Sequence, residues 1–80
     1  METRVAVVAI IVENTDSVGE VNRILHEYSL SIIGRMGIPH RSKGMSIISV
    51  VVDAPHDVIS ALSGKIGRLD GISTKTLYSN

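Results

Sequence analysis

The chain has 80 residues, a length that predicts one domain spanning residues 1–80. It contains no cysteine, which excludes disulfide bonds and thiolate ligation of zinc or of an iron–sulfur cluster. Eight acidic and eight basic residues balance, so we do not expect the basic surface that is typical of nucleic-acid binders. The apolar run near the start, eight residues long, is too short for a membrane span and lacks a signal-peptide cleavage site. We therefore expect a cytoplasmic protein.

The first half of the chain predicts a strand, a helix and a second strand. Residues 3–12 are apolar and mostly β-branched, which is typical of a strand that is buried on both faces. Residues 17–20 fit a capping box, in which the Ser17 hydroxyl would accept a hydrogen bond from the backbone N–H of Glu20. The helix that follows carries apolar residues at three- and four-residue spacing: Val18, Val21, Leu25 and Tyr28.

The second predicted strand, residues 31–38, contains two glycines that indicate a bulge or a close approach to the backbone. Strict alternation would place Arg35 on one face, with Ser31, Ile33 and Gly37. The same alternation would place Ile32 on the other face, together with Gly34, Met36 and Ile38.

The second half predicts a turn at residues 39–44, a strand at 45–53, a helix that Pro55 opens, and a last strand at 72–78. The resulting βαββαβ order predicts an α+β, ferredoxin-like (ACT-like) sandwich, in which two helices cover one face of a four-stranded antiparallel sheet. The apolar strands one and three should occupy the centre. The strands that carry Arg35 and Lys75 should form the edges, where charge discourages unwanted pairing.

Both faces of the central strands are apolar, although two helices can cover only one face. On the first strand one face would carry Val5, Val7, Ala9 and Ile11, and the other Ala6, Val8, Ile10 and Val12. Large exposed apolar patches are uncommon on soluble monomers. We therefore expect the chain to be its own partner, as a homodimer or homotetramer formed through the sheet face or the sheet edges.

Two places in the chain could bind a ligand. Gly34, Arg35, Gly37 and His40 could form an anion or carboxylate clamp, because guanidinium offers paired donors and glycine lets a ligand approach the backbone. The alternative for Arg35 is a charge that protects a sheet edge. Ser17 and Gly19 lie at a helix start, where free N–H groups attract anions, although an ordinary capping box explains the same residues.

Other chemistries have weaker support in the sequence. His26, His40 and His56 share no metal-binding spacing, so we predict no metal, although a metal-responsive sensor formed across an oligomer interface stays an alternative. No spacing forces a catalytic arrangement, so we predict neither an enzyme nor a cofactor. RNA-recognition motifs share the βαββαβ order, but here Met45, Ile47 and Val50 replace the aromatic rings that stack on bases.

The element order and the segment around Asp16 and Gly19 resemble ACT-type regulatory domains. In those domains a glycine near the first helix lies beside an effector site at a protomer interface. The proline of the usual Asp-x-Pro-Gly pattern is absent here. Segments 21–26, 33–39, 47–51 and 61–67 resemble a second, more closely matching family, the small ACT-like regulators of the iron-only hydrogenase system. The resemblance covers nearly the whole chain and is most specific at 35–39 and 62–67. The family name implies a role near hydrogenase expression or maturation. We expect an ACT-like regulator that senses a small ligand or binds a protein partner. The alternative is an oligomeric adaptor without a ligand.

Overall fold

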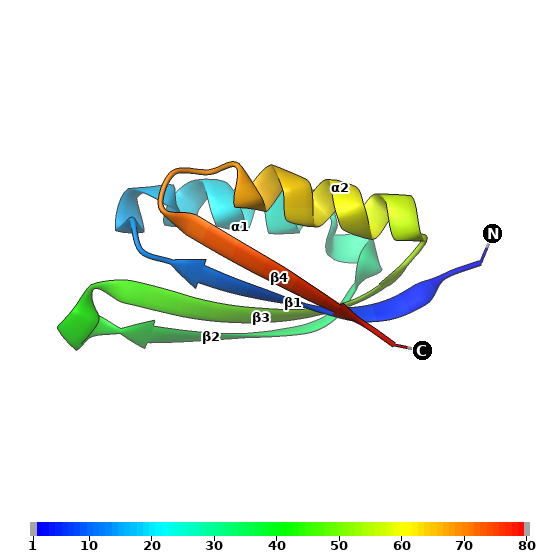
Figure 1. The fold of residues 1–80 in the computed structure, drawn as a ribbon, viewed down its shortest axis with the longest axis horizontal. Coiled ribbons are helices and arrows are strands. Elements are labelled where there is room, and N and C mark those ends of the chain that lie inside the picture. The colour runs from blue at the N-terminus through cyan, green and yellow to red at the C-terminus, as the bar shows by residue number, and fades with distance from the viewer. Residues whose placement is uncertain (1, 80) are drawn as a thin grey trace.

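A computed structural model describes residues 2–79 as one four-stranded antiparallel sheet with both helices on the same face (Figure 1). The strands are β1 (Arg4–Val12), β2 (Ile32–His40), β3 (Met45–Ala54) and β4 (Ile72–Tyr78). The helices are α1 (Val18–Glu27) and α2 (His56–Gly67), and short 3-10 turns occupy Thr15–Ser17, Ser29–Ser31 and Arg41–Lys43. This arrangement confirms the predicted ferredoxin-like α+β fold.

The core lies between the two helices and the two central strands. The strand order is β2-β3-β1-β4, so the most apolar strands occupy the middle, as predicted. From Ala6 in β1 and from Ile48 in β3, every second residue points toward the helices and is buried. These residues are Ala6, Val8, Ile10, Val12, Ile48, Val50, Val52 and Ala54, and they pack against Val21, Ile24 and Leu25 of α1 and Ile59, Leu62 and Ile66 of α2.

Strand β2 contains a β-bulge, which overturns part of the predicted alternation. Ile32 lies opposite Val52 of β3, whereas Gly34 lies opposite Val51, so Ile33 is an extra residue in the pairing. The prediction that Ile32 shares a face with Gly34, Met36 and Ile38 is therefore wrong. Ile32 lies on the helix side of the sheet with Arg35 and Gly37. Gly34, Met36 and Ile38 lie on the opposite side.

The predicted capping box is also wrong, because Ser17 serves a different contact. Its side chain makes no capping hydrogen bond; the hydroxyl instead donates to the carbonyl oxygen of Asp70, at 2.7 Å. The amide of Asn14 donates to the Asp70 carboxylate at 2.9 Å, and the backbone N–H of Glu13 donates to the carbonyl of Gly71 at 2.7 Å. These bonds fasten the loop before α1 to the loop before β4.

Gly71 has a backbone that only glycine fits easily. Its φ angle is +71°, and a Cβ atom at this position would lie 2.5 Å from the Cβ atom of Asn14. The two loops can therefore approach one another only while position 71 lacks a side chain.

The face of the sheet opposite the helices is apolar and uncovered within residues 2–79 (Figure 1). Several of its side chains are largely exposed, among them Leu77 at 73%, Met36 at 61% and Ile38 at 54%. We call this surface the open face. Strand pairing aligns residues of the open face in three rows across the sheet. The first row is Gly34, Val51, Val7 and Leu77, the middle row is Met36, Ser49, Ala9 and Lys75, and the third row is Ile38, Ile47, Ile11 and Ser73.

Candidate functional site

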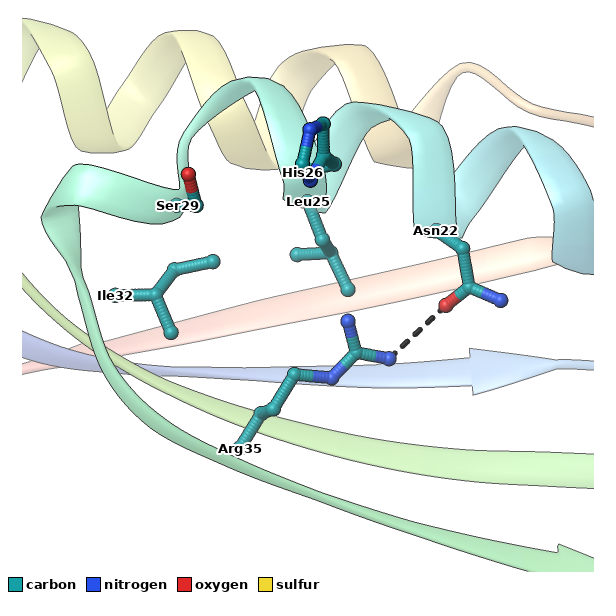
Figure 2. A pocket seen from close by; sticks show the side chains of 6 residues that line it. All are labelled: Asn22, Leu25, His26, Ser29, Ile32 and Arg35. Carbon is teal, nitrogen blue, oxygen red and sulfur yellow. Dashed lines mark hydrogen bonds between the residues drawn. The ribbon is translucent and has the colours of Figure 1, made fainter.

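A hollow of about 300 Å³ lies between helix α1 and strand β2 (Figure 2). Its lining comes from the last turns of α1, the turn that follows and the first half of β2: Asn22, Leu25, His26, Ser29, Ile32 and Arg35. The hollow exists because β2 is an edge strand on which no residue is buried. Leu25 and Ile32 supply its apolar wall, and the other four residues supply polar groups.

A second hollow, of about 180 Å³, continues along the same boundary toward the start of α1. Asn22 and Arg35 line both hollows, which makes them two ends of one groove. The second end is more apolar, because it is lined by Val18, Gly37, Ile38, Pro39, Ser46 and Ile48. We call the combined surface the α1–β2 groove.

Arg35 lies at the junction of the two ends and is held in place by α1. One Nη atom of its guanidinium donates a hydrogen bond to the Oδ1 atom of Asn22, at 2.9 Å (Figure 2). The ion pairs of residues 2–79 join Arg23 to Glu20 and Glu27, and none of them involves Arg35. The groove lining contains no Asp or Glu. The groove is therefore a site with one positive charge that protein carboxylates do not neutralise.

The structure separates the six residues predicted from the sequence. Arg35 and Gly37 line the groove, whereas Gly34 lies on the open face. His40 is exposed at the end of β2, where its Nδ1 atom lies 3.4 Å from the Ser42 hydroxyl. Ser17 is buried in the contact between loops, and Gly19 is exposed with no atom within 4 Å of a Cβ placed there.

Three polar residues of the first hollow were not among the ligand-binding residues predicted from the sequence: Asn22, His26 and Ser29. A signal for two of them was available, because Val18, Asn22 and His26 follow one another at four-residue spacing and so share one side of α1. The prediction of this helix used its apolar stripe, and the polar residues beside that stripe were therefore overlooked.

The three histidines do not meet. Among residues 2–79 no group of three or more histidine or carboxylate side chains could hold a metal ion. The His56 ring instead stacks on the Tyr78 ring, with centroids 5.2 Å apart, and the guanidinium of Arg4 lies over the same Tyr78 ring. Over the same range, neither helix has the length and apolar character that crossing a bilayer requires.

Comparison with known proteins assigns the chain to a family. Its residues 4–76 match the TM1266-like family, described as candidate regulators of the iron-only hydrogenase system. The solved structure of the uncharacterized protein TM1266 from Thermotoga maritima is similar, with 36% sequence identity and a TM-score of 0.94, over 99% of this chain and 100% of that one. No curated protein gives a significant match. With this fold and a match over nearly its whole length, the chain belongs to the TM1266-like family of candidate iron-only hydrogenase system regulators.

Proposed function

We propose that this chain is a non-enzymatic, cytoplasmic regulator that works as a self-associating module and responds to a small effector or a protein partner. The family description supports the regulatory role. The observation that carries self-association is the open face, where apolar side chains of all four strands lie uncovered opposite the helices. The apolar groups of such a surface gain free energy when they leave water.

The dimensions of the open face suit a second copy of the same chain. Nine paired positions along β1 and β3 correspond to a length of about 30 Å, and four strands to a width of about 19 Å. The projected area is on the order of 570 Å² before side-chain relief is added, which approaches the roughly 800 Å² that each partner buries in a standard interface.

The side-chain pattern also favours a symmetric partner. The middle row of the face carries the small Ala9 and Ser49, while the rows on either side carry larger aliphatic residues. Lys75 lies on the edge strand β4, where its ammonium can reach water from the rim of an interface. The positive charge therefore does not have to be buried when two copies meet.

Light scattering on the purified protein at micromolar concentration tests self-association directly. The proposal expects a particle of at least twice 8.6 kDa. A soluble, folded particle of 8.6 kDa over the whole concentration range would contradict it.

The second candidate is an oligomeric adaptor that binds no small ligand. The open face favours this candidate equally, because it supplies a contact surface and requires no effector. Thermal-shift measurements separate the two: a specific, concentration-dependent rise in melting temperature supports a sensor, because a ligand that binds only the folded state stabilises it. A panel of amino acids, organic acids, nucleotides and metal ions that gives no shift supports the adaptor.

A further inference from the structure

The charge of the α1–β2 groove selects the charge of its ligand. Twelve residues line the two ends of the groove; they include one arginine and no carboxylate. Guanidinium is positively charged at every physiological pH and matches the geometry of a carboxylate through two parallel hydrogen bonds. One obligatory positive charge complements a monoanion, whereas a phosphate dianion would keep an excess negative charge in the groove.

Arg35 is already oriented for such a contact. The bond to Asn22 uses one of its five N–H donors and fixes the guanidinium between α1 and β2, and Figure 2 shows the other Nη atom directed toward the helix. An anion that binds there does not have to immobilise a free side chain, which lowers the entropic cost of binding. Ser29 and His26 line the same hollow.

The remainder of the groove selects an apolar body for the ligand. Leu25 and Ile32 border one end, and Val18, Pro39 and Ile48 border the other. Gly37 contributes to this space, because it faces the helix side of the sheet without a side chain. A short or branched aliphatic group attached to the anion would contact these residues on leaving water.

We propose that the α1–β2 groove binds a small aliphatic monocarboxylate, with the carboxylate on Arg35 and the aliphatic group against the apolar wall. A free α-amino acid fits less well, since no carboxylate lines the groove to receive its ammonium group. If the proposed function holds, this ligand is the effector; the groove is complete within one protomer, so a monomer can also bind the ligand.

Chemical shifts measured by NMR on isotope-labelled protein test the site with four probes. The first three are 4-methylpentanoate, leucine, which adds only an ammonium group, and 4-methylpentanamide, which lacks the charge. Inorganic phosphate is the fourth. We expect 4-methylpentanoate to shift the amide signals of the groove residues in β2 and α1, with a dissociation constant on the order of 1 mM. Leucine, the amide and phosphate should each bind at least about tenfold more weakly.

Two variants locate the binding. Arg35→Gln should weaken the binding of 4-methylpentanoate by about tenfold or more, because the charged hydrogen bonds are lost. Arg23→Gln is the matched control, since Arg23 lies on α1 in exposed ion pairs and outside the groove lining, and its affinity should equal that of the wild type. Both arginines are exposed, so both variants should fold.

Several outcomes would overturn the proposal: no shift at about 20 mM, equal binding of the amide, equal or tighter binding of leucine or phosphate, or unchanged affinity in Arg35→Gln. Light scattering on the same samples keeps the two proposals apart. A dimer that ignores 4-methylpentanoate contradicts the ligand site alone, and a monomer that binds it contradicts self-association alone.

Discussion

A single charge placed at the centre of the open face should separate the proposed dimer. Ser49 lies on β3 between Met36 of β2 and Ala9 of β1, and it is half-buried by its neighbours in the protomer. Glutamate at this position can still point away from the helices into water while the protomer is alone. Ser49→Glu should therefore preserve the fold and the thermal unfolding of the isolated protomer.

The cost appears only when two open faces meet. A two-fold symmetric interface contains each position twice, so the dimer would bury two carboxylates near one another. The effective penalty for burying one unpaired ion is several kcal/mol. The rows beside Ser49 carry no charge, and Lys75, the one charge in its own row, lies two strands away on the edge strand. With about 4 kcal/mol or more lost per dimer, the dimer dissociation constant should rise by about 1,000-fold or more.

Light scattering and sedimentation across a concentration series measure this change. Ser60→Glu is the matched control, because it adds the same charge to an exposed position on α2, on the other side of the sheet. The control should associate like the wild type, while Ser49→Glu becomes monomeric. If both variants associate like the wild type, the open face is not the interface, and the reasoning from its apolar rows is refuted.

Three further predictions concern the scaffold and can be checked by denaturant unfolding or NMR. Gly71→Ala should lower the free energy of unfolding by about 1–3 kcal/mol, because alanine disfavours the positive φ at this position and its Cβ atom would lie too close to Asn14. Gly19→Ala should instead raise the free energy of unfolding by up to about 1 kcal/mol, because the space around it is open. Equal effects of the two variants would contradict this reasoning. Ser17→Ala should cost about 1 kcal/mol through the lost bond to Asp70, and an unchanged free energy of unfolding would contradict a contribution from that bond. The Arg23 guanidinium holds the pKa of the Glu20 carboxyl below its usual value, so the stability that this pair contributes is present above the ordinary pKa and is lost as the pH falls through the lowered pKa. In Arg23→Gln the pKa of Glu20, measured by NMR titration, should rise. An unchanged pKa would show that the ion pair does not form in solution.

The fold was predictable because its signals are local and repeated. Two long β-branched runs predicted the central strands, and the spacing of apolar residues predicted which face of α1 is buried. Alternation on β1 and β3 separated the two sets of side chains correctly, because pairing between these strands is regular over nine positions, although it did not say which set faces the helices. Each of these inferences needs only neighbours along the chain.

The errors arise where the deciding partner is far away in the sequence. Ser17 looked like a helix cap from the residues beside it, but the group that receives its hydrogen bond is the carbonyl of Asp70, 53 positions later. The bulge at Ile33 was suspected from the glycines, yet its position could not be found without the partner strand, so Ile32 was assigned to the wrong face. The sequence singled out Arg35 and Gly37, which line the groove, but not Asn22, which accepts the hydrogen bond from Arg35.

Strand β2 links the two proposed surfaces, and thermodynamics makes the link measurable. Arg35 points toward the groove and the next residue, Met36, toward the open face, so a ligand that shifts β2 against α1 also shifts part of the proposed interface. No residue of β2 is buried, which makes it cheaper to displace than the central strands. We therefore expect 4-methylpentanoate to change the dimer dissociation constant. Linkage is reciprocal: the factor, per binding site, by which the ligand changes the dimer dissociation constant must equal the ratio of the ligand affinities of the wild-type dimer and the Ser49→Glu monomer. Equal affinities in the two, measured by NMR, would mean that groove and face act independently.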